Sequence, residues 1–116
     1  MQIDQPAALL AGLLGHRPAP WFRFPGGCTT ALALRAVAAR GLTAVNWDVY
    51  GEDGKNPDPA AIVRAVLRGV RPGSIVLLHM NGPPQAPATA QALPAILAGL
   101  RARGLTPVKL SQLLVE

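Results

Sequence analysis

Residues 74–79 read Ser74-Ile75-Val76-Leu77-Leu78-His79, an aliphatic run that ends in an imidazole. A short run of this kind behind Pro72-Gly73 predicts a β-strand that is buried on both faces, as in a parallel sheet. In α/β proteins the carboxyl ends of such strands carry ligands and catalytic groups. His79 is therefore a candidate functional residue. Its position alone leaves open the alternative of a core histidine with a satisfied hydrogen bond.

Strand-like and helical segments alternate along the rest of the chain. Strands are expected at residues 21–24, 43–50, 75–79 and 106–110. Helices are expected at residues 7–14, 31–40, 59–68 and 90–103, with a helical turn after Ser111. This alternation predicts a parallel sheet with right-handed crossovers. About four βα units are too few to close a barrel of the usual size, so half a barrel and an open four-stranded sheet both fit the pattern.

Residues with capping preferences mark the ends of the expected helices. Thr29 or Thr30 can cap the helix that starts at residue 31, because its hydroxyl can accept a hydrogen bond from a free backbone N–H. Asp58 and Thr89 stand in the same relation to the next two helices. Gly104 is expected to end the last of these helices.

The composition fits one modest domain. The chain has 116 residues, of which 50% are hydrophobic, and a formal net charge of +5. Its arginines are scattered and form no basic block with interleaved aromatics, which argues against nucleic-acid binding. No apolar stretch is long enough to span a membrane, and residues 1–6 lack the pattern of a secretory signal. Cys28 is the only cysteine, so the sequence predicts neither an internal disulfide nor a Cys–His zinc site.

Three segments, each at the carboxyl end of an expected strand, carry a resemblance to a known family. They are Phe22-Arg23-Phe24-Pro25-Gly26-Gly27, Val45-Asn46-Trp47-Asp48-Val49-Tyr50-Gly51-Glu52-Asp53 and Ile75-Val76-Leu77-Leu78-His79. Their order and spacing resemble the last three motifs of the polysaccharide deacetylases, carbohydrate esterase family 4, also called the NodB homology domain. The resemblance implies an α/β fold that forms the carboxyl-terminal half of a distorted (β/α)7-type barrel, with about four parallel strands alternating with helices. Residues 1–116 would then be one partial domain that lacks its amino-terminal metal-binding half.

The resemblance also implies a reaction. Family members remove N-acetyl groups from amino-sugar polysaccharides such as peptidoglycan or chitin-like glycans, using water bound to a divalent metal, with zinc as the expected ion. The family's paired aspartates and two-histidine motif, which supply the base and the metal ligands, have no counterpart in these 116 residues. His16 lies in a Gly-His-Arg-Pro turn with no second histidine at ligand spacing and is expected to be solvated. The isolated chain is therefore expected to be inactive.

The first group of implied roles concerns the chemical step. His79 matches the general acid that protonates the leaving amine. Arg23 matches the arginine that pairs with the catalytic aspartate, a task that suits a rigid guanidinium fork. Gly26 matches the position whose backbone N–H stabilises the oxyanion. The pair Gly26-Gly27 at the start of a helix would also fit an unrelated phosphate-binding module.

The second group of implied roles concerns the substrate. Leu77 matches the apolar wall around the acetyl methyl group, and Pro25 belongs to the same expected substrate-binding set. Trp47 matches a tryptophan that lines the cleft and stacks on a sugar face, although a core position is the alternative.

The chain departs from the family pattern around Tyr50. Tyr50 stands where the family commonly has the aspartate that binds the catalytic histidine, and Gly54 replaces a frequent tryptophan. Asp48 lies two residues before Tyr50 and hence on the same face of the expected strand. Asp48 is therefore the candidate carboxylate partner of His79.

Two alternative functions are compatible with a chain that matches only the carboxyl-terminal half of the family domain. The chain would bind N-acetylated glycan without catalysis, or would assemble with a partner that supplies the other strands. A half barrel exposes sheet edges and an apolar face, which predicts self-association.

Overall fold

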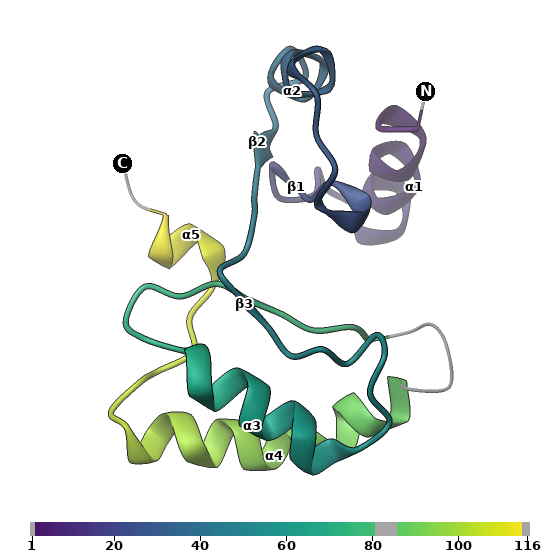
Figure 1. Ribbon diagram of the computed structural model, residues 1–116. Helices are drawn as coiled ribbons and strands as arrows, with labels where there is room; N and C mark the ends of the chain where they lie inside the picture. The colour runs from purple at the N-terminus through teal and green to yellow at the C-terminus, as the bar shows by residue number, and fades with distance from the viewer. Residues whose placement is uncertain (1, 81–85, 115–116) are drawn as a thin grey trace. The chain divides into compact units, whose positions relative to one another are not determined.

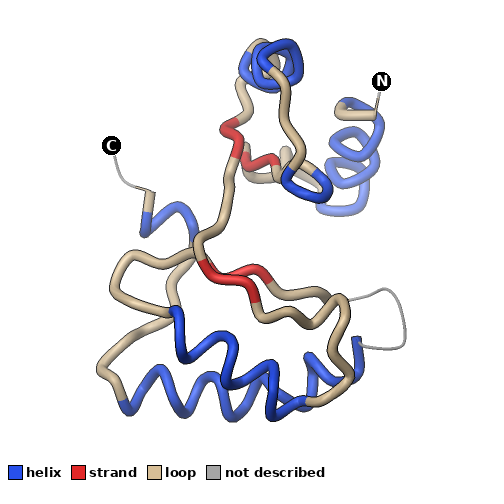
Figure 2. The backbone as a smooth tube through the Cα atoms, in the orientation of Figure 1, coloured by secondary structure: helices blue, strands red, loops and turns tan. Residues whose placement is uncertain are grey.

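The computed structural model describes residues 2–80 and 86–114, and the chain divides into two compact units, Met1–Asn46 and Trp47–Glu116. Each unit combines helices with a pair of short parallel strands (Figure 1). The expected α/β class with parallel strands is confirmed. The single sheet is not what the described residues show, because they form two sheets of two strands each (Figure 2).

The first unit contains helices α1 (Asp4–Leu14) and α2 (Ala31–Ala38) and strands β1 (Trp21–Phe22) and β2 (Thr43–Ala44). The two strands pair in parallel, with Trp21 opposite Thr43 and Phe22 opposite Ala44. A 3-10 turn, η1, covers Pro25–Gly27 between β1 and α2. Arg40 ties the start of α1 to the region after α2, because its Nε and Nη2 donate to the two Asp4 carboxylate oxygens at 2.6 and 3.0 Å.

The second unit contains strands β3 (Val49–Tyr50) and β4 (Val76–Leu77) and helices α3 (Pro59–Gly69), α4 (Ala86–Ala102) and α5 (Leu110–Leu113). The strands pair in parallel, with Val49 opposite Val76 and Tyr50 opposite Leu77. Helices α3 and α4 lie side by side (Figure 1).

The core of the second unit lies between α3 and α4. Ile62 and Val66 of α3 are fully buried, and they are one helical turn apart and therefore on one face. The buried apolar residues described in α4 repeat at the same spacing of four and are Ala88, Ala92, Ile96 and Leu100. Gly99 lets the helices come close, since a Cβ at this position would overlap the Leu67 side chain.

The expected helix caps are partly confirmed. Thr30 Oγ1 accepts a hydrogen bond from the Ala33 N–H at 3.1 Å, and Asp58 Oδ1 accepts one from the Ala60 N–H at 3.0 Å. Gly104 ends α4 with φ 70°. Thr89 is not a cap, because α4 already begins at Ala86 and Thr89 is its fourth residue.

Two expected strands differ from the structure. The segment 43–50 forms β2 and β3 in separate sheets, with residues 45–48 between them. The segment 106–110 forms no strand among the described residues, and α5 begins at Leu110 after Lys109. Pro107 has no N–H to donate to a strand ladder, which explains the failure of this prediction.

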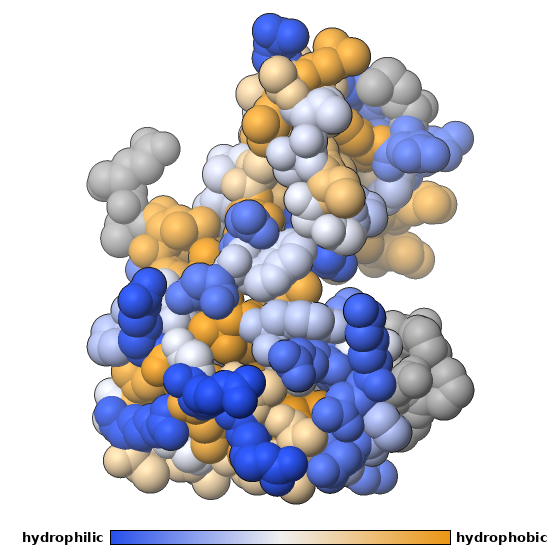
Figure 3. All heavy atoms as spheres, viewed as in Figure 1, coloured by the Kyte–Doolittle hydropathy of each residue, from blue (hydrophilic) through white to orange (hydrophobic). Residues whose placement is uncertain are grey.

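Apolar side chains also reach the surface (Figure 3). Leu9, Leu13 and Leu32 are 70%, 83% and 73% exposed. Self-association through such surfaces or through strand edges stays a prediction. In the described ranges no helix is both long enough and apolar enough to cross a membrane.

Candidate active site

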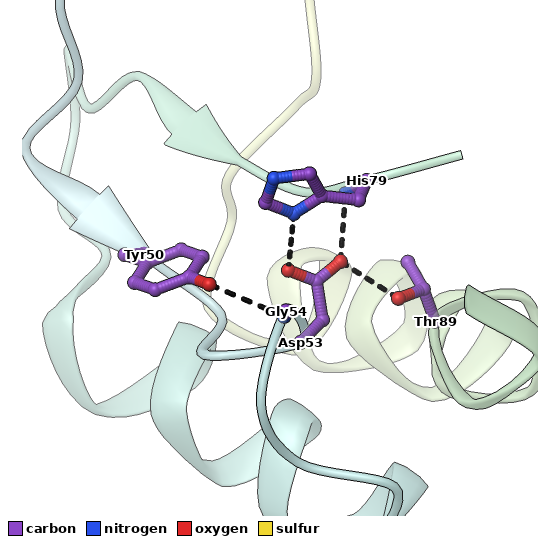
Figure 4. Close-up of polar contacts among 5 residues, drawn as sticks. All are labelled: Tyr50, Asp53, Gly54, His79 and Thr89. Carbon is purple, nitrogen blue, oxygen red and sulfur yellow. Dashed lines mark hydrogen bonds and ion pairs between the residues drawn. The ribbon is translucent and has the colours of Figure 1, made fainter. Parts of the chain in front are cut away.

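His79 follows β4 and faces Asp53, which follows β3 (Figure 4). His79 Nδ1 lies 2.8 Å from Asp53 Oδ1, and the His79 backbone N–H donates to Asp53 Oδ2 at 2.6 Å. The Thr89 hydroxyl, from α4, donates to the same Oδ2 at 2.7 Å. The Asp53 side chain is fully buried, whereas 38% of the His79 side chain is exposed. A buried carboxylate therefore holds one side of an imidazole whose other side reaches solvent.

The pairing of β3 with β4 brings these residues together. Because Tyr50 lies opposite Leu77, the segments that leave the two strands run on side by side toward Asp53 and His79. The Gly51 N–H donates to the Leu77 carbonyl at 3.3 Å and continues the ladder by one bond. The turn into Asp53 passes through Glu52, which has φ 58°. A positive φ is uncommon for a residue with a side chain and is retained where the surrounding structure demands it.

Hydrogen bonds keep Asp53 ionised. Burial raises the pKa of Asp53, but the His79 backbone N–H, the Thr89 hydroxyl and the His79 ring together lower this pKa below its ordinary value. An ionised carboxylate only accepts hydrogen bonds, so His79 Nδ1 carries the proton that points to Asp53. The neutral ring then has its lone pair on Nε2. Nε2 can take up a proton and release it again while Asp53 stabilises the charged ring.

Asp48 does not bind His79, and this prediction is wrong. Asp48 Oδ1 accepts a hydrogen bond from the Ile75 N–H at 2.6 Å, and Oδ2 accepts one from the Ser74 hydroxyl at 2.9 Å. The Ile75 N–H and then the Ser74 hydroxyl lower the pKa of Asp48. The prediction assumed that residues 43–50 form one continuous strand. Since β3 begins only at Val49, Asp48 lies at the amino ends of the strands, away from His79.

Tyr50 lies beside the His79 ring. The centroids of the two rings are 6.1 Å apart, with an interplanar angle of 72°. The Tyr50 hydroxyl oxygen accepts a hydrogen bond from the Gly54 N–H at 3.2 Å (Figure 4). The sequence prediction did not place Asp53 at the site. The only indication in the sequence was that Asp53 is an acidic residue at the end of the second motif.

The remaining predicted site residues belong to both units. Leu77 lies in β4 and Trp47 just before β3, and both are half-buried, which fits a cleft wall as well as a packing role. Arg23 follows β1, and Pro25 and Gly26 belong to η1, where Gly26 has φ 66°. These three residues lie in the first unit, and their roles stay predictions.

The resemblance implies that the metal ligands of the family come from paired aspartates and a two-histidine motif without counterpart in these 116 residues. Within residues 2–80 and 86–114, no three His, Cys, Asp or Glu side chains gather closely enough to hold a metal ion. His16 is exposed, and its Nδ1 lies 2.8 Å from the Arg17 carbonyl oxygen. The described residues therefore do not form the ligand set of a divalent ion.

Comparison with known proteins relates this chain to deacetylases. No family model matches the chain. A chitooligosaccharide deacetylase from Azorhizobium caulinodans is 32% identical over 113 residues, which cover 89% of this chain and 54% of the relative. A peptidoglycan-N-acetylglucosamine deacetylase from Bacillus cereus is 34% identical over 95 residues, covering 80% of this chain and 44% of the relative.

A solved structure agrees with these relatives. The family 4 carbohydrate esterase from Streptomyces lividans, determined in complex with acetate, superimposes with a TM-score of 0.79 at 37% identity, over 94% of this chain and 54% of that protein. The chain thus spans about half the length of the proteins it matches. It belongs with the deacetylases of carbohydrate esterase family 4, as its three motifs predicted.

Proposed function

We propose that this chain contributes the proton-donating part of a deacetylase that hydrolyses N-acetyl groups on an amino-sugar polysaccharide. The observation that carries this proposal is the pairing of His79 Nδ1 with the buried carboxylate of Asp53 at 2.8 Å. Peptidoglycan and chitin-like glycans are the proposed substrates, since relatives are named for chitooligosaccharide and for peptidoglycan. In the complete family domain, the two strand pairs would belong to a distorted (β/α)7-type barrel.

The proposed role of His79 follows from the chemistry of an amide. Water adds to the acetyl carbonyl carbon, and the C–N bond then breaks to leave acetate and a free amine. An amine anion is a poor leaving group, so its nitrogen must take up a proton as the bond breaks. His79 Nε2 donates this proton from the charged ring. Asp53 keeps its bond to Nδ1 throughout and stabilises the charged form by its own negative charge.

The other assignments extend the site by resemblance. Arg23 would hold a catalytic aspartate supplied from outside the described residues, and the Gly26 N–H would face the oxyanion. Leu77, Trp47 and Pro25 would contact the acetyl group and the sugar. The divalent metal of the family, with zinc as the expected ion, would take its ligands from a part of the domain that this chain does not contain.

The purified chain is expected to release no acetate from N-acetylated chitooligosaccharides, with or without added zinc or cobalt. The reason is that the family's paired aspartates and two-histidine motif, which the resemblance implies as base and metal ligands, have no counterpart in these 116 residues. Acetate can be measured by a coupled enzymatic assay, with the Streptomyces lividans esterase as the positive control. Acetate release above the background of a heat-unfolded sample would contradict the expectation.

A chimaera tests the function itself. We expect activity when residues 1–116 replace the matching half of the Streptomyces lividans esterase, and we expect His79→Gln to reduce acetate release by at least about a hundredfold, the low end of what general acid catalysis contributes. His16→Gln is the matched control and should leave the rate unchanged. A folded chimaera that loses nothing on His79→Gln would sink the proposed role of His79.

A glycan-binding module without catalysis is the second candidate. The half-buried Trp47 before β3 supports it, because an indole can stack on a sugar face. In that case the chain alone would bind N-acetylated oligosaccharide in calorimetry, and an otherwise folded chimaera would stay inactive.

A further inference from the structure

We propose that Tyr50 and Gly54 act together as positioning residues for the His79 imidazole, an inference that rests on the proposed role of His79 as proton donor. Asp53 holds His79 at one ring atom, Nδ1. A single hydrogen bond leaves the ring free to tilt about that atom, so a second contact is needed to aim Nε2. Tyr50 supplies this contact, with its ring in an edge arrangement at 6.1 Å between centroids.

The strand register places Tyr50 where it can do this. Tyr50 lies opposite Leu77, and His79 is two residues beyond Leu77. Since side chains alternate between the faces of a strand, residues two apart point to the same side. The ring of Tyr50 and the ring of His79 therefore lie diagonally across the β3–β4 pair on one side, as the close-up shows (Figure 4).

Gly54 in turn holds Tyr50. The Gly54 N–H donates to the Tyr50 hydroxyl oxygen at 3.2 Å, so the phenol is fixed at its far end as well as at the strand. A Cβ at position 54 would lie 2.7 Å from that oxygen and 3.8 Å from His79 Cε1. The first distance is too short for a real contact, and hence a side chain at 54 would push the phenol out of its place. Tyrosine at 50 and glycine at 54 are therefore a matched pair, with the backbone of the loop lying against both rings.

The experiment is NMR spectroscopy of the whole chain, which reads the ring directly and needs no turnover. Tyr50 is the only tyrosine, and His79 is one of two histidines, so each ring signal can be assigned by a single substitution. In the wild type we expect cross-relaxation between the Tyr50 and His79 ring protons. His16, which lies in the other unit, serves as the internal control.

Three variants separate positioning from simple packing. Tyr50→Leu should shift the His79 Cε1–H and Cδ2–H signals while those of His16 stay in place. Tyr50→Phe keeps the ring and loses the hydroxyl, so its His79 signals should return close to the wild type while the Gly54 N–H exchanges faster. Gly54→Ala should shift His79 by displacing an intact Tyr50. If Tyr50→Leu does not fold, as judged by circular dichroism, the other two variants decide.

Unchanged His79 signals in folded Tyr50→Leu and Gly54→Ala would overturn the proposal. The chimaera distinguishes this failure from failure of the proposed function. Shifted His79 signals together with an inactive chimaera would support the positioning of the ring and contradict the proposed deacetylase function. If the chimaera is active and Tyr50→Leu changes neither its rate nor its pH profile, the deacetylase function is supported and the positioning role is contradicted.

Discussion

Replacing Asp53 by asparagine is expected to lower the free energy of unfolding by about 1.5–3 kcal/mol, the contribution typical of hydrogen bonds to a charged group. The two Asp53 oxygens accept three hydrogen bonds from His79 and Thr89, and the side chain is fully buried. Asparagine has one oxygen and an NH2 group that can only donate. The charge-assisted hydrogen bond between His79 Nδ1 and the carboxylate is therefore lost, and only a neutral amide contact can replace it. Urea unfolding followed by circular dichroism measures the loss.

The same substitution should reverse the tautomer of His79. If the amide oxygen of the introduced side chain keeps the bonds from the His79 backbone and from Thr89, its NH2 group faces His79 Nδ1. That nitrogen must then accept, so the ring proton moves to Nε2. Nitrogen-15 shifts of the His79 ring report the change directly. Glu52→Gln, at the exposed neighbouring position, is the control and should keep the wild-type tautomer. A variant that stays folded with its proton on Nδ1 would contradict this account of the site.

The acid side of the stability curve should change as well. The pKa of Asp53 in the folded chain lies below its ordinary value of about 3.9, so its charged form stabilises the fold. This contribution is fully present above the unfolded-state pKa and is lost as the pH falls through the folded-state pKa. Asparagine does not titrate in this range. The difference in unfolding free energy between the wild type and Asp53→Asn should therefore shrink as the pH falls below about 4.

Ile62→Ala is expected to destabilise the second unit by about 2–5 kcal/mol, the usual cost of emptying a fully buried aliphatic position. Ile62 is 0% exposed and belongs to the cluster that joins α3 to α4. It also lies close to Gly51, two residues before Asp53, since a Cβ added at Gly51 would be 3.4 Å from Ile62 Cγ2. The cavity should therefore loosen the turn into Asp53 in addition to weakening the helix pair.

Two comparisons make this result specific. Leu93→Ala removes a similar side chain from α4 at a position that is 43% exposed, and its effect should be much smaller. Ile62→Val leaves most of the side chain and should cost about 0.5–1.5 kcal/mol. Unfolding should be followed at residues of the second unit, for example by the NMR signals of Tyr50. Equal losses for Ile62→Ala and Leu93→Ala would show that the cluster does not carry the stability assigned to it.

Local patterns predicted the helices well. The spacing of apolar residues and the caps at Thr30 and Asp58 indicated α2 and α3 within a few residues, because helix hydrogen bonds and caps lie within one segment. The strands were predicted less well. The segment 43–50 looks continuous as a sequence, but its pairing depends on partners far along the chain, and these split it into β2 and β3.

The candidate site shows the same division. The run at residues 74–79 and the three motifs were enough to single out His79 and to indicate the family, since both depend on residue types at fixed spacing. The carboxylate that binds His79 was not predictable in this way. Asp48 and Asp53 both lie in the second motif, and only the register of β3 against β4 and the left-handed turn at Glu52 decide between them.

By itself, the amino-acid sequence determined an α/β chain with short parallel strands, the approximate positions of its main helices, and a histidine at the end of the run 74–79. The tertiary structure decided which carboxylate is buried against His79, that Thr89 serves this carboxylate instead of capping a helix, and that Tyr50 and Gly54 share one space beside the ring. The physical reason is that hydrogen bonds between side chains distant in sequence depend on how strands pair and helices pack. Those contacts form in the folded chain and leave no fixed spacing in the sequence.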